Sequence, residues 1–370
     1  MRMRSLGDHS SPEGLKIPIR KGSTMDKRRK KWAVGTFFIV ALILLAGCTS
    51  QKVSPKKPIA ENQWIVYSEG DGAGEGKHIV FVTGDEEYRS EEAMPQLAKI
   101  LAKHHGFTCT MLFSINQKTG EIDPETLDNI PGLEALETAD LMVLYTRFRE
   151  LPDEQMKHII DYTNSGKPII GLRTATHAFN YKLSPNSPYA KFSFQDKEFE
   201  GGYGRQVLGE TWVAHYGHHG EEGTRGIIAE GMEDHPIVRG CEDIWGPTDV
   251  YEVGDLTGDS KPIIMGQVVS GMSPDSPPNM DKEPMPVAWI KSYTGEKGET
   301  ARVFTTTMGA APDFESEGLR RLLVNASYWC LGMEDQIPNR ANVDIVGEYN
   351  PTFFGFADHK KGVRPSDHKM

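Results

Sequence analysis

The sequence predicts an α/β domain with parallel strand pairing, because buried strands and amphipathic helices alternate along it. Residues 78–83 and 141–145 are short, continuous apolar runs, which are typical of strands buried on both faces. The first run is followed by a helical pattern whose apolar stripe is formed by Met94, Leu97, Ala98 and Leu101. Repeated strand–helix–strand order favours parallel pairing with right-handed crossovers.

The remaining elements follow in chain order. Strands are predicted at 108–115 and 168–172, and a helix that begins at Pro152 ends before Gly166. Later strand candidates are 250–253, 262–269, 286–293 and 301–307, before a last helix at 315–331. Residues 178–235 are rich in Gly, His and charge and are too long for a simple connection. Ligands of parallel α/β sheets bind at the carboxyl ends of the strands, so the loops there are the expected functional region.

The N-terminal segment predicts export. A basic stretch at 26–31 precedes an apolar run at 33–46, whose fourteen residues are too few to span a bilayer but suit a signal peptide. The run ends in Leu45-Ala46-Gly47-Cys48, which resembles the lipobox of bacterial lipoproteins. That resemblance implies cleavage before Cys48 and diacylation of its thiol, with anchoring to the outer membrane facing the periplasm. The alternatives are a plain secretory signal or a short membrane anchor.

These features divide the chain into four parts. A signal peptide at 1–47, with Met25 as its expected start, precedes a lipid-anchored tether at 48–77. The α/β domain spans 78–333, and an aromatic-containing tail at 334–370 is expected to pack on it. Residues 1–47 hold ten of the 41 basic and three of the 52 acidic side chains, so the rest of the chain has a net charge of −18. Such a charge repels phosphate backbones and argues against a nucleic-acid partner.

The α/β region resembles the ThuA-like (trehalose-utilisation) family of the class I glutamine-amidotransferase-like superfamily. The resemblance lies in the first strand with its acidic loop and in motifs around residues 166–173, 235–237, 249–252, 286–289, 302–309 and 328–332. It implies a flavodoxin-like three-layer α/β/α sandwich with a mostly parallel central sheet. It implies a carbohydrate or sugar derivative as ligand, but no particular reaction.

The strand-to-helix elbow departs from the amidotransferase pattern. Those enzymes carry Gly-Ile-Cys-x-Gly at this turn, where a strained backbone exposes the nucleophile. Here the aligned residues are 171–175, and Arg173 stands at the nucleophile position. An arginine stays protonated and cannot attack a carbonyl, so glutaminase chemistry is excluded at this elbow.

Several charged residues near predicted strand ends are candidates for ligand binding or catalysis. Arg173 could present its guanidinium to a ligand or form an ion pair with Glu86 or Glu87. His177 could be a general base or a histidine bonded to backbone at a helix start. Glu86, from the loop after the first strand, is the expected inward-facing acid, and Arg147 occupies a similar place after the third strand. Asp249 and Glu252, beside a short strand, are the weakest candidates.

The densest histidine cluster contains His215, His218, His219 and Glu222. His215, His219 and Glu222 could bind a metal ion, whereas His218 or His219 could instead transfer protons near neutral pH. A hydrogen-bonded structural loop is the third alternative. No GxGxxG, Walker A or HExxH pattern occurs, so no other cofactor is expected.

Cys109, Cys241 and Cys330 form no CxxC pair, which argues against a zinc ribbon or a thioredoxin-like site. The sequence therefore predicts a lipid-anchored ThuA-like protein that binds or processes a carbohydrate by acid/base chemistry without a cysteine nucleophile. A non-catalytic saccharide- or partner-binding lipoprotein is the alternative, and a metal-dependent hydrolase is a third. The oligomeric state is left open.

Overall fold

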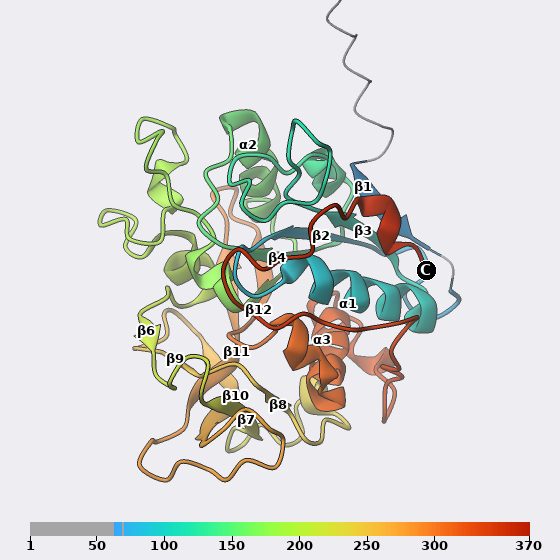
Figure 1. Cartoon of the computed structure of the whole chain (residues 1–370), viewed down its shortest axis with the longest axis vertical. Helices are drawn as coiled ribbons and strands as arrows, with labels where there is room; N and C mark the ends of the chain where they lie inside the picture. The colour runs from blue at the N-terminus through green and yellow to red at the C-terminus, as the bar shows by residue number, and fades with distance from the viewer. Residues whose placement is uncertain (1–62, 69) are drawn as a thin grey trace, which may run out of the picture. The chain divides into compact units, whose positions relative to one another are not determined.

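The computed structural model describes residues 63–68 and 70–370, which all belong to one compact unit (Figure 1). The predicted signal peptide, Cys48 and most of the predicted tether lie outside these residues. Among the described helices, none is long and apolar enough to cross a membrane. The three cysteines of the described part, Cys109, Cys241 and Cys330, are buried free thiols.

The unit is built on a ten-stranded sheet with the order β1-β3-β2-β4-β5-β12-β11-β10-β7-β8. The strands are β1 (Trp64–Tyr67), β2 (His78–Gly84), β3 (Thr108–Leu112), β4 (Leu141–Thr146), β5 (Ile169–Leu172), β7 (Gly223–Ile228), β8 (Trp245–Gly246), β10 (Lys261–Val269), β11 (Met285–Thr294) and β12 (Thr300–Thr306). Two short strands, β6 (Ala214–His215) and β9 (Tyr251–Glu252), form a separate antiparallel pair.

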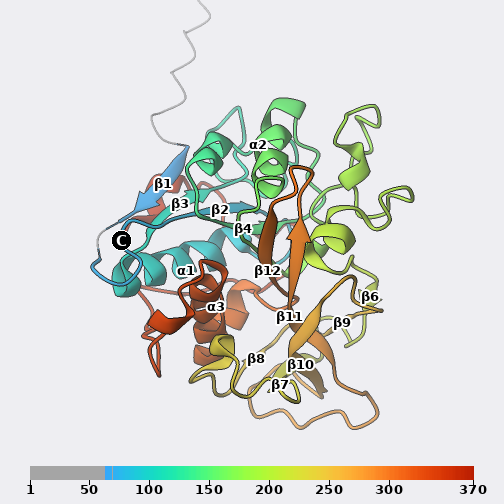
Figure 2. The same cartoon turned by 180° about the vertical axis from the view of Figure 1, so that it is seen from behind.

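The sheet is mixed, so the prediction of mostly parallel pairing holds for only one half of it. The pairs β3–β2, β2–β4, β4–β5 and β5–β12 are parallel. The pairs β1–β3, β12–β11, β11–β10, β10–β7 and β7–β8 are antiparallel. Figure 2 shows β11 and β10 continuing the sheet beyond β12. Strands β10, β11 and β12 follow one another without an intervening helix, and the short connection at 295–299 is of the kind that joins antiparallel strands.

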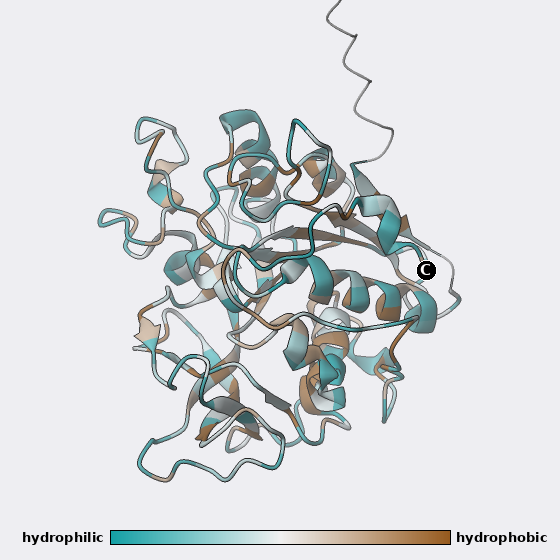
Figure 3. Cartoon of the chain, viewed as in Figure 1, coloured by the Kyte–Doolittle hydropathy of each residue, from teal (hydrophilic) through white to brown (hydrophobic). Residues whose placement is uncertain are grey.

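Helices cover both faces of the parallel half. Helices α1 (Ser90–His105) and α3 (Glu317–Cys330) share one hydrophobic core with the side chains on one face of the strands. Helix α2 (Asp153–Thr163) and the 3-10 helix η1 (Leu133–Glu137) share the core on the other face. In Figure 3 the hydrophobic colour gathers on the strands and on the sides of the helices that face them. This pattern follows from strands that are apolar on both faces.

The loop between β2 and α1 is fixed by the local backbone. Arg89 precedes the helix with a φ of 64°, a left-handed conformation that is uncommon for a residue with a side chain. Helix α1 ends at Gly106, whose φ of 76° allows its N–H to bond to the carbonyl of Ala102 at 3.1 Å. Pro95 is the sixth residue of α1 and lies beyond its first turn. The loop at 85–89 is thereby held at the carboxyl end of β2.

Residues of the C-terminal tail contact the domain near this loop. The backbone N–H of Gly355 donates to the carbonyl of Glu87 at 2.8 Å, and the hydroxyl of Tyr349 donates to the carbonyl of Ala311 at 2.7 Å. The ring of Phe354 lies 5.6 Å from that of Tyr88 between centroids. The tail therefore supplies part of the surroundings of the β2–α1 loop.

Candidate functional site

Arg173 occupies an elbow that connects β5 to the 3-10 helix η2 (Arg173–His177). Its φ is 44°, so the strained strand-to-helix turn of the nucleophile elbow is present although the residue cannot be a nucleophile. The side chain is fully buried, and its guanidinium lies 4.3 Å from the ring centre of Tyr88 and 4.1 Å from that of Tyr251. Two aromatic faces thus enclose the cation.

The guanidinium of Arg173 is bonded within the protein. Its Nη1 donates to the carbonyls of Asp249 at 2.9 Å and Thr307 at 2.7 Å, and its Nη2 donates to Oδ1 of Asp249 at 3.1 Å. The expected ion pair with Glu86 or Glu87 is therefore replaced by one with Asp249. Because the side chain has no exposed surface, Arg173 does not present its fork to a ligand, and we assign it a positioning role.

Asp85 ties the β2–α1 loop to the elbow. Its Oδ1 accepts hydrogen bonds from the backbone N–H groups of Glu87, at 2.8 Å, and of Tyr88. Its Oδ2 accepts a hydrogen bond from the hydroxyl of Thr174, one residue after Arg173. The carboxylate thus fixes both the loop that carries the acids and the turn that carries the arginine.

Glu86 is tied between two arginines. One carboxylate oxygen pairs with Arg147 and the other with Nη2 of Arg149 at 2.6 Å. Arg149 is fully buried and also donates to backbone carbonyls, including that of Pro124 at 2.8 Å. Both carboxylate oxygens of Glu86, the expected inward-facing acid, are therefore occupied in this internal network. The adjacent Glu87 is the carboxylate that lines the pocket described below.

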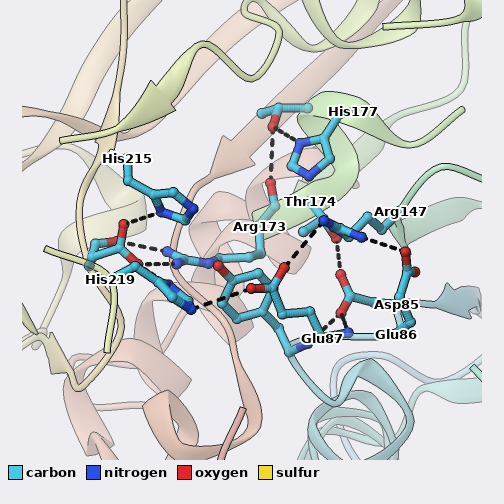
Figure 4. A network of polar contacts seen from close by, with 12 residues as sticks. Asp85, Glu86, Glu87, Arg147, Arg173, Thr174, His177, His215 and His219 are labelled. Carbon is cyan, nitrogen blue, oxygen red and sulfur yellow. Dashed lines mark hydrogen bonds and ion pairs between the residues drawn. The ribbon is translucent and has the colours of Figure 1, made fainter. Parts of the chain in front are cut away.

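His215, His219 and Asp249 form a second cluster on the other side of Arg173. Nδ1 of His215 lies 2.7 Å from Oδ2 of Asp249, and Nδ1 of His219 lies 3.1 Å from Oδ1. Figure 4 shows both histidines on one side of Arg173 and the Glu86–Arg147 network on the other. Burial alone would raise the pKa of Asp249, but the two histidine hydrogen bonds and the charge of Arg173 hold that pKa well below its ordinary value.

The other two members of the predicted histidine cluster lie elsewhere. Glu222 is bonded to Lys282 and Asn279, each at 2.8 Å. Burial alone would raise the pKa of Glu222. The hydrogen bonds that Glu222 accepts, that of Lys282 first among them, together lower this pKa more strongly, and the pKa falls to about 2. The side chain of His218 is exposed, and its backbone N–H donates to Glu222 at 2.8 Å. The set predicted for a metal, with Glu222 as the carboxylate, is thus replaced by a set with Asp249.

His177 is buried in an aromatic environment. Its ring centroid lies 5.0 Å from that of Phe148 and 5.6 Å from that of Trp212, and its Nδ1 is 3.2 Å from the hydroxyl of Thr176. Burial, followed by the positive charges of Arg147 and Arg173, holds the pKa of His177 well below its ordinary value. The imidazole is therefore neutral near pH 7.

A small pocket opens between these groups. It is lined by Glu87, Tyr88, Arg147, Phe148, His177, Trp212, His215 and Tyr251. Three of the predicted site residues, Arg147, His177 and His215, are thus brought together. His218 and Glu222 are not, and His219 lies beside the pocket through its 3.4 Å contact with Glu87.

Sequence reasoning did not select Glu87, Trp212 or Tyr251. Glu87 differs from Glu86 only by one position in an irregular loop, where no periodicity tells which side chain faces inward. Trp212 lies in the long segment at 178–235. An aromatic side chain among the glycines and histidines of that segment could have indicated a binding surface. The sequence places Tyr251 in a strand at 250–253. In the structure Tyr251 belongs to β9, which pairs with β6 and not with the main sheet.

Comparisons with known proteins identify the family. A family model described as "ThuA: Trehalose utilisation" matches residues 78–330. Similar solved structures include a protein described as ThuA-like from Parabacteroides merdae ATCC 43184, with 14% identity, a TM-score of 0.43, and 76% of this chain and 97% of that chain covered. Another is from Bacteroides uniformis ATCC 8492, with 14% identity, a TM-score of 0.42, and 71% and 95% covered. No curated protein matches the chain. Because the family model covers more than half of the sequence, the chain belongs to the ThuA family.

Proposed function

We propose that the pocket beside Arg147 and His177 binds a saccharide or a sugar derivative, and that Glu87 transfers a proton to or from it. The observation that carries the proposal is the position of Glu87, a buried carboxylate on the pocket wall. Burial raises its pKa above the ordinary value, although the charge of Arg147 opposes the shift. A raised pKa brings a carboxyl group closer to the pH at which it can both accept and donate a proton.

The lining suits a polyhydroxylated ligand. Sugar rings carry hydroxyl groups that hydrogen-bond to charged side chains, and apolar C–H faces that pack against aromatic rings. Arg147, Glu87 and neutral His177 supply the polar partners, while Phe148, Trp212 and Tyr251 supply the aromatic surface.

The arrangement favours proton transfer over a covalent route. The elbow residue Arg173 cannot form a covalent intermediate with a carbonyl. Glycoside hydrolysis generally uses two carboxyl groups flanking the scissile bond, and Glu87 is the only carboxylate among the residues that line this pocket. Isomerisation, or another step that moves a proton next to a carbonyl carbon, therefore fits the site best.

Binding and turnover of the full chain test this proposal. Isothermal titration with a panel of mono- and disaccharides and their oxidised derivatives should identify a ligand. Glu87→Gln keeps the shape of the side chain but removes its proton transfer, so we expect retained binding and a loss of turnover of about 100-fold or more. Glu252→Gln, at an exposed position of β9, is the matched control and should leave both unchanged. Full activity of the Glu87→Gln variant would rule out the assigned role.

A non-catalytic saccharide-binding protein is the second candidate. It is favoured by the arginine at the elbow, which removes the nucleophile that the turn would otherwise expose. In that case the titration would give binding by both the native protein and Glu87→Gln, with no product from either. A metal-dependent hydrolase is a third candidate, and it requires a cation next to the pocket.

We further propose that the chain is exported and that lipidated Cys48 anchors it to the outer membrane, where the domain faces the periplasm. The support is the basic stretch, the apolar run and the Leu45-Ala46-Gly47-Cys48 sequence. Metabolic labelling with a palmitate analogue should label the native chain and not Cys48→Ser. Equal labelling of both would contradict lipidation at this cysteine.

A further inference from the structure

We propose that His215, His219 and Asp249 form a binding site for one divalent transition metal ion of the zinc class. One ligand atom from each residue lies within 4.8 Å of the other two. Two imidazole nitrogens and one carboxylate oxygen form a ligand set that proteins use for Zn²⁺ and related ions at catalytic sites, where a fourth position stays open.

The distances suit a shared cation. The Nδ1 atoms of His215 and His219 lie 2.7 and 3.1 Å from the two oxygens of Asp249. Ligand atoms that each lie about 2.0–2.2 Å from one Zn²⁺ are roughly 3.0–3.5 Å from one another. To bind one ion, the imidazole nitrogens must move slightly away from Asp249, and the ligand atoms, which all lie within 4.8 Å of one another, must converge on the ion.

The backbone brings the three ligands together before any ion binds. His215 is in β6, where it pairs with Tyr251 of β9, and Asp249 lies two residues before that partner. The segments approach closely at Gly217, where a Cβ atom would lie 3.0 Å from that of Asp249. The backbone N–H of Gly217 also bonds to the carbonyl of Val250 at 3.0 Å. Such preorganisation reduces the ordering that binding would otherwise require.

Groups around the ligands have the arrangement that supports metal sites. Nε2 of His219, the nitrogen on the far side of the ring, lies 3.4 Å from Oε1 of Glu87. A carboxylate at this position accepts the second N–H of a metal-bound histidine and fixes its tautomer. Arg173 holds Asp249 through both its carboxylate and its carbonyl. Arg173 therefore fixes the orientation of the Asp249 carboxylate toward the two histidines.

The local charge accommodates a cation. The carboxyl groups of Asp85, Glu86, Glu87 and Asp249 are interleaved with the guanidinium groups of Arg147, Arg149 and Arg173. The nearest positive charge, on Arg173, is enclosed by the rings of Tyr88 and Tyr251. The side chains of His215 and His219 are 36% and 33% exposed, which leaves a route for an ion to reach them.

The metal site stands independently of the saccharide proposed above, because its ligands and distances need no second molecule. The two are adjacent, however, since His215 belongs to the cluster and also lines the pocket with Glu87. An open coordination position on that side would face a hydroxyl or carbonyl oxygen of a pocket ligand and polarise it.

Titration of the full, chelator-treated chain with Co²⁺ and Zn²⁺, in the absence of any saccharide, tests the site. We expect one equivalent of Co²⁺ to bind with visible d–d absorption and to be displaced by Zn²⁺. His215→Ala and His219→Ala should weaken binding by about 10-fold or more. The control is His218→Ala, because His218 is the adjacent, exposed histidine outside the cluster.

Thermal unfolding separates loss of the site from loss of the fold. Zn²⁺ should raise the melting temperature of the native chain and of His218→Ala but not that of folded His215→Ala. Failure of the native chain to bind one equivalent, or equal weakening by His218→Ala, would overturn the metal site. Neither result bears on saccharide binding, which is measured in the metal-free protein by a separate titration.

Discussion

Arg173 and Asp249 form a fully buried ion pair, with 3.1 Å between Nη2 and Oδ1, that joins the β5 elbow to the histidine cluster. The pair places an arginine at the turn after β5 and uses it to hold the carboxylate that faces His215 and His219. In the proposed function, the chemistry therefore takes place in the pocket beside Glu87 and not at the elbow.

Removal of Arg173 should destabilise the fold strongly. Arg173→Met leaves Asp249 buried without its cation, and losing one partner of a buried pair costs about 3–5 kcal/mol. Urea unfolding of the native and variant chains measures the difference. The control is Arg302→Met, whose partly exposed pair with Glu334 should contribute less than about 1 kcal/mol. An equal loss of unfolding free energy in the two variants would show that the buried pair stabilises the fold no more than the exposed pair does.

Glu91 should make the protein less stable as the pH rises. Burial raises its pKa to about 8 from an ordinary value of 4.5, and both carboxylate oxygens lack a hydrogen-bond partner among the described residues. Because the unfolded chain loses this proton first, the free energy of unfolding should fall between about pH 4.5 and pH 8.

Glu91→Gln should remove that fall and stabilise the chain by about 2–4 kcal/mol at pH 8. Urea unfolding at pH 5 and pH 8 gives the measurement. Glu154→Gln, at an exposed position in the first turn of α2, serves as the control and should leave the pH dependence as it is. If the stability of the Glu91→Gln variant fell with pH as that of the native chain does, Glu91 would not be the cause of the fall.

Two adjacent phenylalanines of the tail should differ in their importance. Phe354 is 7% exposed and packs on His219 and Tyr88, with ring centroids at 5.3 and 5.6 Å, whereas Phe353 is 50% exposed. Phe354→Ala should destabilise the chain by about 3 kcal/mol, because it leaves a cavity in a packed region. Phe353→Ala should cost less than about 1 kcal/mol. Thermal and urea unfolding compare them, and the reverse order would contradict the packing of the tail at the site.

The parallel half of the fold was predictable because its strands are continuous apolar runs separated by amphipathic helices. The strands at 78–83, 141–145 and 168–172 lie within or close to β2, β4 and β5. The antiparallel half was not, because apolar runs alone do not give strand direction. Only the short connection between β11 and β12 carried that information.

The candidate site was predictable in part. Arg147 and His177 follow predicted strands, and the rule that ligands bind at strand carboxyl ends placed them together. Asp249 was the weakest candidate because its partners lie 30 or more positions away, in His215 and His219, and pairing at that separation leaves no local pattern. Arg173 was located correctly at the elbow, but its burial depends on Tyr88 and Tyr251, from two other segments.

The position of a bound saccharide tests the central claim most directly. A crystal structure of the full chain with the sugar identified by titration would show which residues it contacts. We predict electron density for the ligand in the pocket, with a hydroxyl or carbonyl oxygen within hydrogen-bond distance of Glu87 and others near Arg147 and His177. Density at a different surface, with this pocket free of the ligand, would contradict the account.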